Sequence, residues 1–166
     1  MVIKVPALRT LAMVGLGYIL GVIIPSALLF SYLLQVAKPL GLFQEKVREP
    51  LPWVIVGPYP IERDLRRLRD VSGVEEVISL LDPKLPFEAL LIAEEEKAAV
   101  RLGLKFRKEP FSYINLKNPD TQERLFRLAE QVYQRGPRVK VYVHCYLGRH
   151  RAKAFEEALL TLVKRR

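Results

Sequence analysis

The most informative part of the sequence is an apolar run that leads into the only cysteine: Val139-Lys140-Val141-Tyr142-Val143-His144-Cys145-Tyr146-Leu147-Gly148-Arg149-His150-Arg151. Apolar residues alternate up to His144, which predicts a strand over 139–144, and a helix-forming run follows over 153–164. A tight loop between a strand and a helix directs backbone N–H groups and the positive end of the helix dipole at one point. The stretch therefore predicts an anion-binding loop.

Two residues of this loop have the chemistry of phosphate transfer. The field of a helix N-terminus favours a cysteine thiolate, which makes Cys145 a candidate nucleophile. Arg151 is suited to bind phosphate oxygens through its planar guanidinium. The alternative is a buried, inert cysteine. The expected phosphate-binding residues are the five between these two: Tyr146, Leu147, Gly148, Arg149 and His150.

The two histidines beside the cysteine do not indicate a metal site. His144, His150 and Cys145 fall in one tight turn, and the chain has no other His or Cys to complete a closed zinc site. We expect His144 to brace the loop and His150 to form part of its wall. The sequence gives no reason to expect a metal or another cofactor.

The spacing His-Cys, five residues, Arg resembles the cysteine-based phosphatases, and it is most similar to their dual-specificity group, which includes phosphoinositide and phosphatidylglycerophosphate phosphatases. The resemblance covers roughly residues 50–158 and implies a phosphocysteine intermediate on Cys145. The segments that carry it are Val56-Gly57-Pro58-Tyr59-Pro60, Val77-Ile78-Ser79-Leu80-Leu81-Asp82, Leu102-Gly103-Leu104-Lys105-Phe106, Pro110-Phe111 and Tyr142-Val143-His144-Cys145.

The chain departs from this family at two helper positions. The resemblance implies an aspartate general acid in the loop after Pro110-Phe111, where Tyr113 or Ile114 stands instead. We assign the role to Asp120, which alternatively complements the dipole of a following helix; Asp82 and Glu109 are further candidates. Ala152 replaces the usual Ser or Thr after the arginine, which predicts slow breakdown of the intermediate.

Strands and helices are expected to alternate along the second part of the chain. The pattern predicts an α/β fold with a mainly parallel sheet and helices on both faces, similar to the dual-specificity phosphatases, over a domain of residues 53–166. Cys145 then lies at the carboxyl ends of the strands, where ligands bind. The expected strands are 53–56, 77–80, 104–107 and 139–144, and the expected helices 61–71, 87–102, 118–134 and 153–164.

The N-terminal part has the composition of a membrane anchor. The 28 positions of 10–37 carry no charged residue, whereas about 20 apolar residues span a bilayer. The sequence therefore predicts a short tail (1–9), one transmembrane helix (10–37) and a juxtamembrane linker (38–52); a buried soluble helix is the alternative. Gly17 and Gly21 form a small-xxx-small pair that permits a homodimer. A slight excess of basic residues after the span favours a cytoplasmic C-terminal domain.

The charge balance favours an anionic surface as partner. All 18 acids and 25 of the 27 basic residues lie after residue 37, which gives this part a net charge of about +7. A basic domain tethered to a bilayer is attracted to anionic headgroups, and no nucleic-acid-binding motif is present. Expected contacts at the rim of the site are Arg107, Lys108, Lys117 and Arg149.

The sequence thus predicts a membrane-anchored cysteine phosphatase acting on an anionic phospholipid headgroup phosphate. Three alternatives remain open at this stage. They are a phosphoprotein phosphatase, a non-catalytic phosphate-binding membrane adaptor, and sulfur-transfer or arsenate chemistry on a rhodanese-like anion loop.

Overall fold

The computed structural model describes residues 45–112 and 114–165. No helix within these residues is long and apolar enough to cross a membrane. The predicted tail 1–9, the predicted span 10–37 with its Gly17–Gly21 pair, and linker residues 38–44 lie outside the described residues. The membrane anchor and the homodimer therefore stay predictions.

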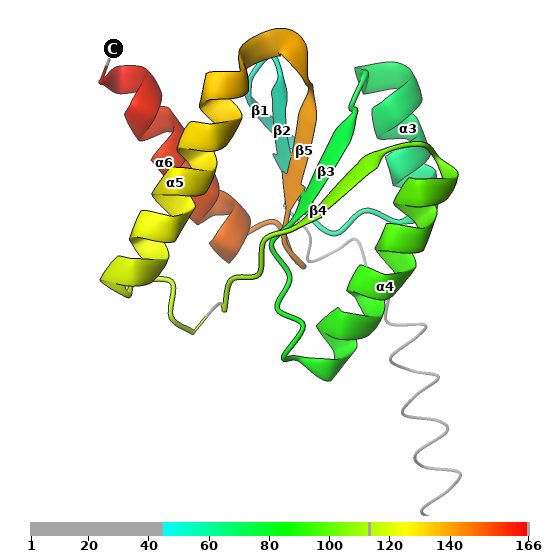
Figure 1. The fold of residues 1–166 in the computed structure, drawn as a ribbon, viewed down its shortest axis with the longest axis horizontal. Coiled ribbons are helices and arrows are strands. Elements are labelled where there is room, and N and C mark those ends of the chain that lie inside the picture. The colour runs from blue at the N-terminus through cyan, green and yellow to red at the C-terminus, as the bar shows by residue number, and fades with distance from the viewer. Residues whose placement is uncertain (1–44, 113, 166) are drawn as a thin grey trace, which may run out of the picture. The chain divides into compact units, whose positions relative to one another are not determined.

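The centre of the described domain is a five-stranded sheet in the order β1-β2-β5-β3-β4 (Figure 1). β2, β5, β3 and β4 pair in parallel, and β1 pairs antiparallel with β2 at one edge. This confirms the predicted mainly parallel sheet. The strands are β1 (Arg48–Leu51), β2 (Val54–Gly57), β3 (Glu76–Ser79), β4 (Lys105–Lys108) and β5 (Val141–His144).

The edge strand β1 corrects the predicted linker boundary. Residues 48–51 were expected outside the domain, yet they form a hairpin with β2 through the turn at Pro52-Trp53. The sequence Arg48-Glu49-Pro50-Leu51 lacks apolar alternation because an edge strand buries little of its surface, so its pairing with β2 is not visible in the pattern.

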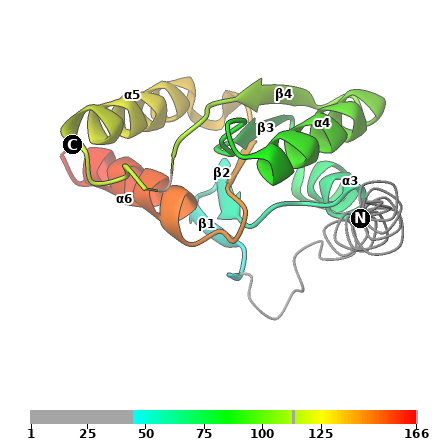
Figure 2. The ribbon, with the colours of Figure 1, turned by 90° about the horizontal axis from the view of Figure 1, so that it is seen from below.

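Two layers of helices cover the sheet, as the sequence predicts (Figures 1 and 2). Successive strand residues point to opposite faces, so Val56 packs with α5 and α6, whereas its neighbour Ile55 packs with α3 and α4. The helices are α3 (Glu62–Ser72), α4 (Pro86–Arg101), α5 (Pro119–Arg135) and α6 (His150–Lys164), and a 3-10 turn, η3 (Gly136–Arg138), precedes β5.

The last helix begins earlier than the sequence indicates. α6 starts at His150 rather than Lys153, which places Arg151 and Ala152 in its first turn. Its N-cap residue, Arg149, makes no side-chain cap bond, so the usual start signal is missing. The burial of Arg151 and Ala152 instead fixes where the helix begins.

Candidate functional site

Cys145 lies directly after β5, at the carboxyl ends of the parallel strands. Its side chain is buried, with 3% of the residue exposed, and it borders a cavity of about 190 Å³. The cavity is lined by Glu88, Cys145, Tyr146, Leu147, His150 and Arg151. The structure therefore brings together most of the residues that the sequence predicts for the site, and it adds Glu88.

The loop after Cys145 is held in place by hydrogen bonds to its carbonyl oxygens. Three successive carbonyls accept bonds from groups outside the loop: Tyr146 O from Tyr59 N (3.1 Å), Leu147 O from Glu45 N (3.0 Å) and Gly148 O from Arg48 Nη2 (3.1 Å). The chain has no cis peptide bond among its described residues, and the N–H of a trans peptide points opposite to its C=O. The N–H groups that follow these carbonyls therefore face away from the anchoring groups, in the arrangement of a backbone anion site.

Gly148 cannot be replaced by a larger residue without moving the loop. Its φ is +75°, in the left-handed region, and a Cβ there would lie 2.8 Å from Pro58 N and 2.9 Å from Gly57 C. Both neighbours are backbone atoms, so they cannot rotate away. The glycine is required because the loop packs directly on the turn that follows β2.

Arg151 forms a two-pronged ion pair with Glu88 inside the protein. Its Nη1 and Nη2 donate to Glu88 Oε2 and Oε1 at 2.8 and 2.6 Å, and only 4% and 2% of the two residues are exposed. Nη1 also lies within hydrogen-bond distance of Leu80 O (3.1 Å) and Phe111 O (3.2 Å). Burial works against the charged guanidinium, but the bonds to Glu88 outweigh it and raise the pKa of Arg151.

Glu88 is a site residue that the sequence reasoning missed. It was hidden in the helix predicted over 87–102, although a signal was present. Glu88 and Glu95 share one helix face with Ile92 and Ala99, and all four are buried. Two acids on an otherwise apolar stripe indicate buried partners, because an unpaired carboxylate is costly to bury.

None of the acids considered as proton donors lines the Cys145 cavity. Asp120 is exposed in the first turn of α5, where its N–H donates to Asn118 Oδ1 at 2.9 Å. Asp82 accepts a bond from Lys84 N at 3.0 Å within a turn, and Glu109 accepts one from Arg107 Nε at 2.6 Å. Ala152 is fully buried in the first turn of α6, and its methyl side chain provides no hydroxyl.

The basic residues expected at the rim are mostly engaged with acids. On β4, Arg107 pairs with Glu109 and Lys108 with Glu96, and neither basic residue is among those that line the cavity. Arg149 lies in the loop itself, where its Nε is 3.0 Å from Glu45 Oε1. Lys117 is exposed in the loop before α5.

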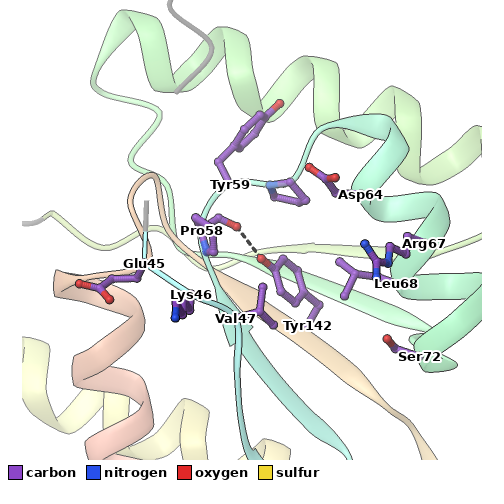
Figure 3. A pocket seen from close by; sticks show the side chains of 11 residues that line it. Glu45, Lys46, Val47, Pro58, Tyr59, Asp64, Arg67, Leu68, Ser72 and Tyr142 are labelled. Atoms are coloured by element: carbon purple, nitrogen blue, oxygen red, sulfur yellow. Dashed lines mark hydrogen bonds between the residues drawn. The ribbon is translucent and has the colours of Figure 1, made fainter. Parts of the chain in front are cut away.

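A larger cavity of about 570 Å³ is lined in part by the segment 58–60 (Figure 3). Its lining includes Tyr59, Asp64, Arg67 and Tyr142, with the phenol of Tyr142 donating to Pro58 O at 2.6 Å. Cys145 is not among its lining residues. Tyr142 also contacts His144, so this cavity adjoins the residue that precedes Cys145.

Solved structures share this fold at low sequence identity, while no protein-family model and no curated protein matches the chain. A proposed phosphatase (DUF442) from Shewanella putrefaciens aligns with a TM-score of 0.55 and 21% identity, covering 72% of this chain and 69% of that one. The core catalytic domain of the PP-IP phosphatase SIW14 from S. cerevisiae, in complex with citrate, aligns with a TM-score of 0.56 and 17% identity, covering 73% of this chain and 68% of that one. PTPMT1 aligns with a TM-score of 0.45 and 22% identity, covering 72% of this chain and 82% of that one.

The chain has the fold of the cysteine-based phosphatases. The resemblance inferred from the His144-to-Arg151 spacing is thus confirmed at the level of the fold. In this phosphatase fold the spacing occupies the loop between β5 and α6, at the edge of the sheet where a ligand is expected.

Removal of the Glu88 carboxylate tests the buried ion pair. Glu88→Ala leaves the Arg151 guanidinium buried without a counter-charge, so we expect the free energy of unfolding to fall by about 3–5 kcal/mol. Glu96→Ala is the matched control on the same helix: Glu96 pairs with Lys108 at the surface, and its loss should cost about 0–1 kcal/mol. Denaturant unfolding of both variants measures the difference, and equal stabilities would contradict this account of the pair.

Proposed function

We propose that this protein is a cysteine-dependent phosphatase that hydrolyses phosphate monoesters. The observation that carries the proposal is the position of Cys145, which borders a small cavity together with Arg151. The carbonyl oxygens of the loop that follows Cys145 accept hydrogen bonds from groups outside the loop. Such a loop stabilises the charge on the oxygens of a transferring phosphoryl group through preorganised N–H donors.

The reaction proceeds in two displacement steps. The Cys145 thiolate attacks phosphorus, an S–P bond forms, and the P–O bond to the alcohol breaks while the leaving oxygen takes up a proton. Water then attacks the phosphocysteine, the S–P bond breaks, and inorganic phosphate and the thiolate are released. No redox partner or cofactor is needed for either step.

Arg151 has donors left for the phosphate. A guanidinium has five N–H donors. The bonds to Glu88, Leu80 and Phe111 occupy Nη1 and one N–H of Nη2. The Nε–H and the second Nη2–H are those that a bound phosphate can use. Glu88 thereby sets the plane in which Arg151 meets the phosphate.

The proposed substrate is an anionic phospholipid headgroup phosphate. Phe87 and Leu90, at the start of α4, are 38% and 66% exposed. The Phe87 ring lies 5.5 Å, edge-on, from that of Tyr146, which lines the Cys145 cavity. An apolar wall beside a phosphate cavity fits a molecule that joins a phosphate to an apolar body. The predicted span 10–37 and the basic composition support a membrane-anchored enzyme.

Loss of the nucleophile tests the activity itself. Cys145→Ser in the full chain should reduce phosphate release from anionic lipid phosphates in mixed micelles to background, because the hydroxyl is a far weaker nucleophile than a thiolate. Soluble phosphopeptides and an inositol pyrophosphate, the class named for SIW14, serve as comparison substrates. Turnover by Cys145→Ser equal to that of the parent chain would refute the proposal, and faster turnover of a soluble substrate would reassign its class.

The apolar wall predicts a loss that depends on the substrate. Phe87→Ser should lower kcat/KM about tenfold or more for a long-chain lipid phosphate, because the buried apolar contact is lost. It should change p-nitrophenyl phosphate turnover little. Val100→Ser, at a 69% exposed site near the other end of α4, is the control and should leave both rates unchanged. An equal effect of Phe87→Ser on both substrates would argue against lipid recognition.

Asp120 is the proposed proton donor to the leaving oxygen. An alkoxide leaving group needs this proton more than a nitrophenolate does, so Asp120→Asn should reduce hydrolysis of an alkyl phosphate about 10²–10⁴-fold and that of p-nitrophenyl phosphate far less. If Asp120→Asn lowers the rates for the two substrates by the same factor, Asp120 is not the proton donor. Asp82→Asn then tests the next candidate by comparing the same two rates.

A second candidate function is a phosphate-binding membrane adaptor. The buried Ala152 favours it, as does the absence of Asp120, Asp82 and Glu109 from the residues that line the Cys145 cavity. Rapid mixing of the full chain with lipid phosphate separates the two functions. A burst of alcohol release followed by slow turnover indicates an enzyme with a long-lived phosphocysteine, whereas saturable binding without a burst indicates an adaptor.

A further inference from the structure

The second buried acid of α4, Glu95, is not used by the proposed chemistry, yet it lies under the catalytic loop. Glu95 Oε1 is 2.6 Å from His144 Nε2, and both side chains are fully buried. His144 is the last residue of β5 and directly precedes Cys145. The helix that supplies the partner of Arg151 therefore also supplies the partner of the residue before the nucleophile.

At this short distance the two atoms attract each other only if one of them carries a proton. A bare imidazole nitrogen and a carboxylate oxygen are both acceptors and would repel each other at 2.6 Å. The contact is not aligned as a straight hydrogen bond, and within the described residues neither side chain has another hydrogen-bond partner. An ionised carboxylate buried without a partner is strongly unfavourable, so Glu95 depends on the proton carried by His144.

Two tyrosines enclose this pair and exclude water from it. The Tyr142 ring stacks on the His144 ring at 5.7 Å and 15°, and the Tyr59 ring meets it edge-on at 5.9 Å and 70°. Tyr142 also lines the cavity shown in Figure 3.

The two phenols do not supply a charge to the pair. Burial, and then the negative charge of Glu95, raise the pKa of both tyrosines. They therefore stay neutral, and their hydroxyls donate to main-chain oxygens, of Pro58 for Tyr142 and of Leu91 for Tyr59. The other charged or titratable groups that act on this cluster are Glu94, Asp64, Arg48 and Cys145.

The pair is connected to the catalytic loop through the backbone. His144 O accepts a bond from Leu80 N at 2.9 Å, and Leu80 O in turn lies 3.1 Å from Arg151 Nη1. Tyr59, whose ring touches His144, donates its N–H to Tyr146 O. Leu80 and Tyr59 therefore link His144 to the arginine and to a loop carbonyl.

We propose that Glu95 is a positioning residue that acts through His144: its carboxylate holds the proton on His144 Nε2 and so locks the imidazole that supports the Cys145 loop. This rests on the proposed function only in taking that loop as catalytic. Glu95 does not touch the substrate, and its effect on turnover is exerted through the position of Cys145 and of the loop N–H groups.

Proton NMR of the full chain in micelles tests the pair without turnover. The chain has two histidines, and a ring N–H held against a buried carboxylate resonates far downfield of the amides. We expect one such resonance, retained in His150→Asn, moved upfield in Glu95→Gln and lost in Glu95→Met. Glu96→Gln, at the neighbouring position that pairs with Lys108, should leave it unchanged. Its absence from the parent chain, or its persistence in Glu95→Met, would overturn the proposal.

Activity separates a proton-holding role from simple packing. Glu95→Gln keeps an acceptor for the His144 proton, whereas Glu95→Met fills a similar volume without one. We expect kcat/KM for p-nitrophenyl phosphate to fall about tenfold or more in Glu95→Met and clearly less in Glu95→Gln. If Glu95→Met is as active as Glu95→Gln, or more active, Glu95 has only a packing role and the proposal is overturned. If the parent chain has no phosphatase activity, the proposed function fails, while the NMR result still decides on the pair.

Discussion

The buried ion pair between Arg151 and Glu88 is the interaction on which the site depends. It joins the first turn of α6 to the first turn of α4, across the ends of the central strands. The same guanidinium contacts the main chain after β3 and after β4, at Leu80 and Phe111. Because both charged groups are buried, removing either one would leave the other charge buried without a counter-charge. The two helix starts, on opposite faces of the sheet, are thereby fixed relative to Cys145.

Around this pair, hydrogen bonds from outside the Cys145 loop hold the loop that is proposed to bind an anion. The loop carbonyls are bound by residues of the segment leading into β1, of β1 itself and of the segment after β2, so the loop N–H groups have one direction left to face. Gly148 permits the close contact with the turn at Gly57-Pro58. The edge strand β1, which buries little apolar surface, thus matters because Arg48 binds Gly148 O.

The two glutamates of α4 divide the support of the site between them. Glu88 binds the arginine that is proposed to hold the phosphate, and Glu95 contacts the histidine before Cys145, the proposed nucleophile. They are seven positions apart, which is two helical turns, so both face the sheet. One helix therefore connects both flanks of the Cys145 loop, and its exposed start carries the apolar residues Phe87 and Leu90 beside the cavity.

The sequence by itself determined the local elements and predicted the role of the loop. Apolar patterns located four of the strands and all four α-helices of the described domain, and the spacing from His144 to Arg151 predicted an anion site, because these signals depend on neighbours in the chain. Tertiary structure alone decided the edge strand β1, the early start of α6 and the partners Glu88 and Glu95. Each of these depends on a group more than 40 positions away or on another strand of the sheet, and a buried charge shows its partner only when the chain has folded around it.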